Sequence, residues 1–324
     1  MTRAIRIHAT GGPEALCWDE VTTGAPGPGE ALLRHTAVGV NYIDTYHRSG
    51  LYAVALPATL GMEAAGVVEA VGEGVTEVTV GQRVAYAGGP IGAYAEARLI
   101  PAHRLVPLPP EISDDQAAAI MLKGMTAQYL LRQTHVVQPG ETILIHAAAG
   151  GVGLIACQWA KHLGATVIGT VGSDEKAAPA RAHGCDHVIV YTREDFVARV
   201  KEITAGRGVR VVYDSVGKAT WDGSLDCLQP RGLMVSYGNA SGAVPPFSPL
   251  VLSAKGSLYL TRPTLMTYTA GRDELLATAA DLFDVVRAGV VTPLISATYP
   301  LRAAAQAHRD LEARRTTGSL LLLP

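Results

Sequence analysis

Short apolar or alternating runs, separated by glycine and proline, fill the chain up to residue 122. The runs cover residues 30–40, 64–72, 82–88 and 93–100. Apolar side chains at every second position are typical of β-strands with one buried face, and the glycines and prolines between the runs are typical of turns. We therefore expect a mostly β, barrel-like domain here. Ser113 is placed to cap a helix that begins at Asp114.

From Lys123 onward, strand-like runs alternate with longer runs of helical spacing. Glycine follows each of three helical runs, at Gly164, Gly184 and Gly206, where helices commonly end. Alternation of strands and helices predicts βαβ units and a parallel sheet whose two faces are both covered. We expect about six strands in this half. The fold class is therefore α/β, with a doubly wound parallel sheet next to the β domain.

The chain after Met266 contains two helical runs, residues 274–289 and 301–314, with a strand-like run between them. It closes on the apolar run of residues 319–323, which we expect to be a last strand that returns to the first domain. The predicted domains are therefore residues 1–122 with 266–324, and residues 123–265.

Composition narrows the class of protein. Lys and Arg number 27 and Asp and Glu number 29, so the formal net charge is −2, which argues against a protein built mainly to hold nucleic acid or anionic lipid. Four scattered cysteines form no C-x-x-C pair and suit a reducing compartment. The start has no apolar signal sequence, and the two long uncharged stretches contain glycine clusters or prolines. We expect a cytoplasmic protein that does not enter a membrane.

The sharpest local signal is the turn from Ala147 to Gly153, which reads A-x-x-G-G-x-G between a buried strand and a helix. Backbone N–H groups at such a helix start bind a pyrophosphate, and glycine lets the phosphates come close. We expect Gly150, Gly151 and Val152 to contact a dinucleotide.

The end of the next strand indicates which dinucleotide binds. Gly172 and Ser173 stand where NAD sites usually carry an acidic residue, and Lys176 follows. Asp174 would disfavour a 2′-phosphate if it pointed inward, but we expect Ser173 and Asp174 to form the helix N-cap. Lys176 would then face the phosphate of NADPH. The alternative is that Lys176 is a solvated surface lysine.

Longer blocks carry a resemblance over essentially the whole chain. They are GVNYIDTYHRSGLY (39–52), GMEAAGVVEAVGEGV (61–75), GLIACQWAK after the glycine turn, VVYDSVG (211–217) and RGLMVSYGNASG (231–242). The chain resembles the zeta-crystallin-like, zinc-free branch of the medium-chain dehydrogenase/reductase superfamily, in its bacterial form. The resemblance implies a GroES-like β domain, a Rossmann domain and an NADPH:quinone oxidoreductase activity in the cleft between them.

The same resemblance implies that no zinc takes part. Alcohol dehydrogenases of the superfamily place a cysteine and a histidine where this chain has Asn41 and Met62, and neither residue is a ligand for such a zinc. The lobe with four clustered cysteines is missing as well. Without a Lewis acid, the substrate must accept hydride readily, as quinones do and activated enones do next.

The resemblance also implies roles for residues on the matching segments. Asn41, Asp44, Tyr46 and Tyr52 would line the catalytic site, where Tyr46 or Tyr52 hydrogen-bonds a quinone oxygen. Alternatively both tyrosines only pack, and Asp44 orients the loop. Arg314 would help to hold a cofactor phosphate, or else is a helix-end arginine. The implied NADPH contacts are Asn41, Tyr46, Thr126, Tyr191, Ser215, Val216, Gly238, Asn239, Ser241 and Arg314.

Two other functions stay open at this point. An NADPH-dependent 2-alkenal or enone reductase would need the same fold and cofactor. A protein that binds RNA, or serves as a crystallin-like structural protein, is disfavoured by the net charge and by the absence of an aromatic RNA-binding motif. Relatives pair as dimers, and residues 233–242 and 255–263 are candidates for the exposed sheet edge through which a homodimer would form.

Overall fold

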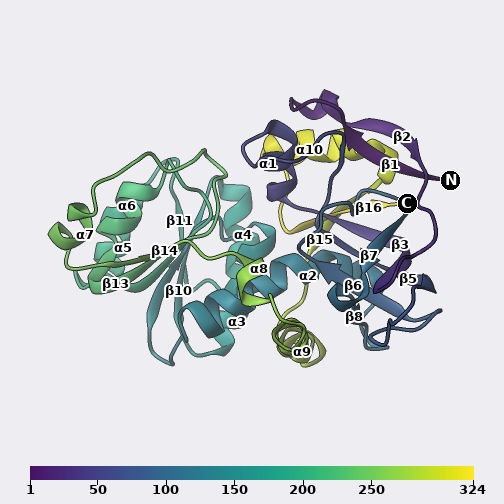
Figure 1. The fold of residues 1–324 in the computed structure, drawn as a ribbon. Coiled ribbons are helices and arrows are strands. Elements are labelled where there is room, and N and C mark those ends of the chain that lie inside the picture. Colours follow the sequence, from purple (N-terminus) through teal and green to yellow (C-terminus); the bar gives the residue numbers. More distant parts are fainter. The chain divides into compact units, whose positions relative to one another are not determined.

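Two sets of strands organise the chain in the computed structural model, which describes all residues from 1 to 324 (Figure 1). Unit 1 contains residues 1–125, 268–287 and 293–324, and unit 2 contains residues 126–267 and 288–292. Unit 1 is mostly β, and unit 2 is built on a parallel sheet with helices. The predicted fold class is confirmed.

Unit 1 holds two sheets. Its three-stranded sheet has the order β2-β1-β4, and its seven-stranded sheet has the order β15-β16-β3-β5-β6-β8, with β7 also paired to β3. The strands are β1 (Thr2–Ile7), β2 (Cys17–Val21), β3 (Glu30–Val40), β4 (Ala58–Thr59), β5 (Glu63–Val71), β6 (Arg83–Ala87), β7 (Ala97–Pro101), β8 (Val106–Pro107), β15 (Ile295–Pro300) and β16 (Ser319–Leu323). The helical segments are η1 (Pro13–Ala15), α1 (Tyr42–Ser49), η2 (Ala102–Arg104), α9 (Arg272–Arg287), η4 (Leu301–Ala303) and α10 (Ala304–Glu312). Two helices span the boundary with unit 2, α2 (Asp114–Tyr129) and α8 (Leu265–Tyr268).

The alternation in β3 builds the core of unit 1. Ala31 and Leu33 are fully buried in the hydrophobic cluster of unit 1, whereas Arg34 and Thr36 are exposed. Each fully buried leucine of this kind contributes roughly 1.5–3 kcal/mol. The apolar strand at the C-terminus pairs antiparallel with β3, so that Leu321 lies opposite Gly39. The expected return of the last strand to the first domain is confirmed.

Unit 2 has a six-stranded parallel sheet in the order β11-β10-β9-β12-β13-β14. The strands are β9 (Thr142–Ile145), β10 (Thr166–Val171), β11 (His187–Val190), β12 (Val209–Asp214), β13 (Leu228–Ser236) and β14 (Tyr259–Thr261). The helices are η3 (Leu130–Thr134, a π-helix), α3 (Gly151–His162), α4 (Asp174–Ala182), α5 (Phe196–Ile203), α6 (Trp221–Asp226) and α7 (Leu250–Ala254). Helices cover both faces, which explains the continuous apolar strands. The order reverses at β9, the switch point where such sheets bind ligands.

Helix ends follow the predicted signals. Ser113 Oγ accepts a hydrogen bond from the backbone N–H of Gln116 at 3.1 Å, and Gln116 Oε1 accepts one from Ser113 N at 3.0 Å, so a capping box begins α2. Gly164, Gly184 and Gly206 have φ of 86°, 101° and 80°, the left-handed conformation that ends a helix.

The edge of the parallel sheet differs from one of our expectations. Strand β14, within residues 255–263, is at the edge, and its Tyr259 is exposed. Residues 233–236 belong to β13, which pairs with both β12 and β14 and is therefore internal. The candidate segment 233–242 was therefore wrong as a sheet edge, because β14 pairs with its strand residues.

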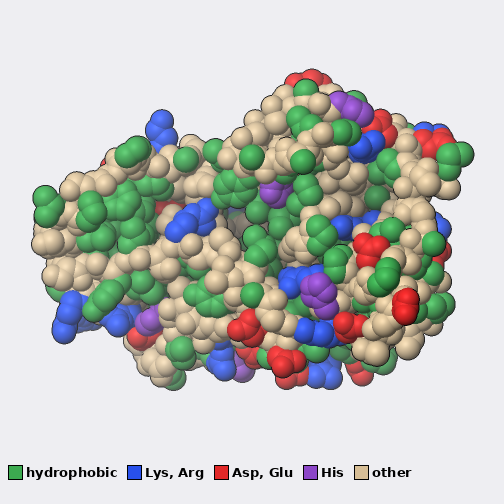
Figure 2. Space-filling view, viewed as in Figure 1, with side chains coloured by type: hydrophobic (Ala, Val, Ile, Leu, Met, Phe, Trp, Pro, Cys, Tyr) green, Lys and Arg blue, Asp and Glu red, His purple; other side chains and the backbone are tan.

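The surface carries charges of both signs. Figure 2 shows acidic and basic side chains interspersed on the face in view, with no extended area of one sign. No helix is long and apolar enough to cross a bilayer.

Candidate active site

The predicted phosphate-binding turn joins β9 to α3 in unit 2. Gly150 is the N-cap of α3, and its N–H donates to Ala147 O at 2.8 Å. A Cβ on Gly153 would lie 2.3 Å from Ala147 O, so only glycine fits there. The turn therefore presents backbone N–H groups at a helix N-terminus, and these fit the pyrophosphate of a dinucleotide.

Ala147 occupies the first position of the turn with φ of 52°. This is the left-handed region, which costs a residue with a Cβ of order 1–2 kcal/mol. The surrounding structure must therefore hold this residue in place.

The carboxyl ends of β10 and β11 bring Gly172 and Tyr191 together. A Cβ on Gly172 would lie 3.2 Å from the Tyr191 hydroxyl. Ser173 is the N-cap residue of α4, as expected, and Lys176 is half-buried in the first turn.

Asp174 is the first residue of α4, so its carboxylate lies in the first turn of the helix, at the helix start where we expected it. It also pairs with Arg193 at 2.8 Å, and both side chains are exposed. The arginine comes from the segment after β11, which sequence reasoning could not place beside α4. An exposed pair contributes little to stability, but it compensates the charge of Asp174.

The turns after β12 and β13 lie against each other. A Cβ on Gly238 would lie 2.5 Å from Ser215 O, so glycine permits this approach. Ser241 Oγ donates to Val216 O at 2.8 Å, and Ser241 N donates to the same oxygen at 2.8 Å. Asn239 lies within the second turn. The structure thus brings together the predicted cofactor residues of both turns.

Unit 1 contributes the residues around α1. Asn41 is its N-cap residue, and the backbone N–H of Asn41 donates to Asp44 Oδ2 at 2.8 Å. Tyr94 OH donates to the same oxygen at 2.9 Å. Asp44 is fully buried, and burial raises the pKa of its carboxyl to about 7. These two hydrogen bonds tie the Asp44 carboxyl to the N-terminus of α1 and to Tyr94.

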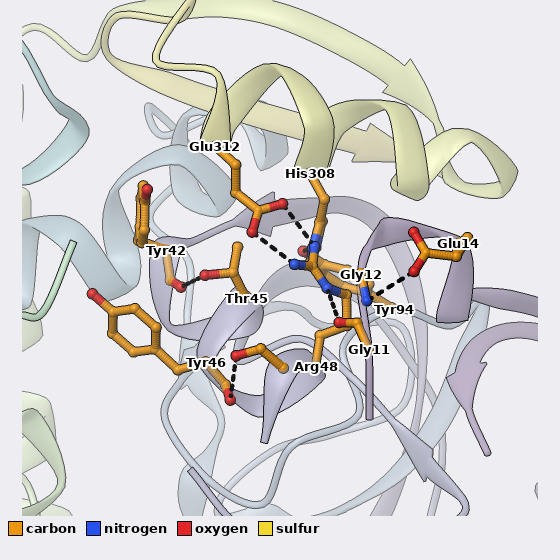
Figure 3. Close-up of polar contacts among 11 residues, drawn as sticks. Gly11, Gly12, Glu14, Tyr42, Thr45, Tyr46, Arg48, Tyr94, His308 and Glu312 are labelled. Carbon is orange, nitrogen blue, oxygen red and sulfur yellow. Dashed lines mark hydrogen bonds and ion pairs between the residues drawn. The ribbon is translucent and has the colours of Figure 1, made fainter. Parts of the chain in front are cut away.

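The predicted tyrosines are neighbours. The Tyr46 ring is 5.2 Å from that of Tyr52, edge to face, and 5.8 Å from that of Tyr42. Figure 3 shows Tyr42 and Tyr46 pointing away from Arg48 and His308.

Two further residues that we expected to contact the coenzyme, Thr126 and Arg314, lie outside these turns and outside α1. Thr126 is buried in α2, and Arg314 is exposed just after α10, with φ of 57°.

A buried ion pair that sequence reasoning missed lies beside Asn41. Glu63 Oε2 is 2.8 Å from Lys123 Nζ and accepts a hydrogen bond from Asn41 Nδ2 at 2.8 Å. Glu63 Oε1 accepts one from Leu122 N at 2.7 Å. We expected a structural role for Glu63, but Lys123 carried no signal because it lies in α2, 60 residues after Glu63 in the sequence.

A second missed group anchors α1 to α10 (Figure 3). Arg48 forms a two-point ion pair with Glu312, at 2.7 and 3.0 Å, and donates to His308 Nδ1 at 3.0 Å. Burial lowers the pKa of His308 to about 3, so the neutral ring donates from Nε2 to Tyr94 OH, 3.0 Å away. Arg48 does not release a proton at accessible pH, so this chain positions Asp44 and is no proton path.

The two residues at the positions of the zinc ligands, Asn41 and Met62, make other contacts in this protein. The Asn41 amide is bonded to Glu63, and Met62 is buried. Nowhere in the chain do three or more His, Cys, Asp or Glu side chains lie together in a way that could hold a metal ion.

Comparison with known proteins identifies the family. Residues 27–110 match the alcohol dehydrogenase GroES-like domain, and residues 151–284 match the zinc-binding dehydrogenase family. A quinone oxidoreductase of Pseudomonas aeruginosa is 55% identical over 325 residues, covering both chains completely. A 2-haloacrylate reductase of Burkholderia is 52% identical and covers 100% of this chain and 99% of its own.

The solved structures agree. Escherichia coli quinone oxidoreductase complexed with NADPH is 52% identical, covers 99% of this chain and 100% of its own, and has a TM-score of 0.98. The chain therefore belongs to the quinone oxidoreductases of the medium-chain dehydrogenase/reductase superfamily.

Proposed function

We propose that this protein reduces quinones with NADPH and needs no metal ion to do so. When bound, NADPH supplies a hydride from its nicotinamide, and the quinone takes up that hydride and one proton to become a hydroquinone. The observation that carries the proposal is the turn at Ala147–Gly153. Its glycines allow a tight backbone turn at the N-terminus of α3, where backbone N–H groups can bind a pyrophosphate. Similarity to quinone oxidoreductases along the whole chain supports it.

The proposal includes a role for each of the two domains. Residues 123–265 form the NADPH-binding domain, and residues 1–122 with 266–324 form the substrate and catalytic domain. The coenzyme contacts are Asn41, Tyr46, Thr126, Gly150, Gly151, Val152, Gly172, Ser173, Lys176, Tyr191, Ser215, Val216, Gly238, Asn239, Ser241 and Arg314.

The direct test is NADPH oxidation by the purified protein with a panel of quinones and enones, with metal content measured on the same sample. We expect turnover with naphthoquinone and benzoquinone in samples that contain far less than one zinc per chain. A stoichiometric zinc on which turnover depends would overturn the metal-free mechanism.

A second candidate activity is reduction of an activated double bond. The relative named 2-haloacrylate reductase is as similar to this chain as the quinone oxidoreductases are. Both reactions deliver a hydride to an electron-poor carbon or oxygen. Higher kcat/KM for a short alkenal or a haloacrylate than for naphthoquinone would favour this candidate.

Coenzyme preference depends on Lys176. Exchange of Lys176 for glutamate replaces a cation beside the 2′-phosphate with an anion, so we expect KM for NADPH to rise about tenfold or more. KM for NADH should change less than about twofold, because NADH lacks that phosphate. Lys201→Glu, on the exposed side of α5, is the matched control. Equal effects on both coenzymes would remove Lys176 from the phosphate site.

Tyr46 is the proposed hydrogen-bond partner of the quinone oxygen, with Tyr52 beside it and with Asn41 and Asp44 holding α1. Tyr46→Phe keeps the ring packing and removes the hydroxyl, so kcat/KM for a simple benzoquinone should fall about tenfold. Tyr299→Phe is the control, since the Tyr299 hydroxyl in β15 donates to Asp310 in α10. An unchanged kcat/KM in Tyr46→Phe leaves water as the proton source.

We also propose a cytoplasmic homodimer. Strand β14 offers an unpaired sheet edge, and Leu250 and Phe247 nearby are exposed, in the region where Figure 2 shows hydrophobic side chains gathered over α6 and α7. The four cysteines are unpaired, which suits a reducing compartment. Sedimentation should show a species of twice the 33.9 kDa chain mass.

A further inference from the structure

A buried chain of hydrogen bonds lies directly beneath the phosphate-binding turn. His146 follows β9 and precedes Ala147, and it is fully buried. Its Nδ1 is 2.7 Å from Thr170 Oγ1, and its Nε2 is 3.0 Å from Ser224 Oγ. Ser224 Oγ in turn donates to Asp214 Oδ2 at 2.8 Å. Thr170, Ser224 and Asp214 are also fully buried.

The direction of every bond in this chain is fixed. Ser224 gives its hydrogen to the Asp214 carboxylate, so its oxygen accepts from His146 Nε2–H. His146 Nδ1 then accepts from the Thr170 hydroxyl. Burial lowers the pKa of His146, so the ring is neutral and has one donor and one acceptor, as the chain requires. The Phe196 ring packs edge-on against it at 5.2 Å.

Three of the four members lie next to turns to which we assign coenzyme contacts, and the fourth, Ser224, lies in α6. His146 directly precedes Ala147, which carries the strained φ of 52°. Thr170 is two residues before Gly172. Asp214 directly precedes Ser215, and its Oδ1 accepts from Val216 N at 2.8 Å and from Gly217 N at 3.0 Å.

Ser, His and Asp also form the triads of hydrolases, but this group is built differently. In a triad the serine proton goes to histidine, and the carboxylate holds the other ring nitrogen. Here Ser224 donates to the carboxylate, and all three side chains are closed off from solvent. The arrangement holds backbone in place and provides no nucleophile.

We infer that His146 is a positioning residue for the coenzyme. It joins the ends of β9, β10 and β12, so that the three turns that follow these strands contact NADPH in one fixed arrangement. The inference rests on the proposed function, since it takes these turns as the NADPH site. A preorganised site avoids the entropic cost of ordering its loops on binding. Losing the connection should therefore weaken coenzyme binding more than it slows hydride transfer.

The test uses isosteric removal of single hydroxyls. We expect Thr170→Val, which loses one buried hydrogen bond, and Ser224→Ala, which loses two, each to raise the Kd of NADPH about tenfold or more in calorimetric titration. The double variant should raise it by less than the product of the two effects, because both act through the same imidazole. His146→Gln keeps one donor and one acceptor and should bind NADPH more tightly than His146→Leu does.

A matched control separates positioning from general loss of stability. Thr204 is a buried hydroxyl at the end of α5, where it donates to Val200 O at 2.8 Å and accepts from Gly208 N at 3.0 Å. Thr204 lies before the first residue of β12, at the amino end of that strand. The coenzyme turns follow the carboxyl ends of the strands, so Thr204 is remote from them. Thr204→Val should lower the urea midpoint as much as Thr170→Val does but leave the Kd of NADPH within about twofold.

The outcomes distinguish the two proposals. If the unaltered protein binds neither NADPH nor NADH, the proposed function fails. If it binds NADPH while Thr170→Val, Ser224→Ala and His146→Leu lose stability without a change in Kd beyond that of Thr204→Val, the positioning role is overturned and the proposed function stands.

Discussion

Replacement of Gly153 by alanine should nearly abolish coenzyme binding. The added Cβ would lie 2.3 Å from Ala147 O and 2.8 Å from the Ala148 carbonyl carbon, and both are backbone atoms that cannot turn aside. The turn must therefore move, and the N–H groups that face the pyrophosphate move with it. We expect Kd for NADPH to rise about a hundredfold or more, which corresponds to about 2.7 kcal/mol.

The effect should not depend on which nicotinamide coenzyme is used, because the pyrophosphate is common to both. This distinguishes Gly153→Ala from Lys176→Glu. Gly271→Ala is a suitable control, since its added Cβ would come no closer than 3.4 Å, to the flexible Glu274 side chain. Wild-type affinity in Gly153→Ala would show that the pyrophosphate does not bind at this turn.

Loss of the buried carboxylate at position 63 should be the most damaging change to stability. In Glu63→Gln the shape is nearly kept, but Lys123 is left as a buried, unpaired cation, since Nζ has Glu63 as its ion-pair partner at 2.8 Å. Removing one partner of a buried pair costs about 3–5 kcal/mol in free energy of unfolding. The urea unfolding midpoint of purified protein measures it.

Two comparisons make this prediction specific. Glu69→Gln breaks the exposed pair with Arg34 and should cost less than about 1 kcal/mol. The double variant Glu63→Gln with Lys123→Met removes the stranded charge and should be more stable than Glu63→Gln alone. A loss below about 1 kcal/mol in Glu63→Gln would mean that Lys123 reaches water once its partner is gone.

Local patterns predicted the elements well because the forces behind them are local. Alternating side chains in residues 30–40 predicted β3, and Ser113 predicted the start of α2. The phosphate turn was readable because its glycines are required by backbone geometry within seven residues. The ion pair of Asp174 was not predicted, since its partner Arg193 belongs to a different βα connection.

The sequence by itself determined the α/β class, the six parallel strands, the dinucleotide turn and the absence of zinc ligands at positions 41 and 62, because periodicity, glycine spacing and side-chain chemistry act along the chain. Only the tertiary structure decided which buried polar groups meet: Glu63 with Lys123, Arg48 with Glu312, and His146 with Thr170 and Ser224. These partners lie 24 to 264 residues apart. Their pairing follows from the need to satisfy every buried donor and charge once the strands are in register, and no local pattern carries that requirement.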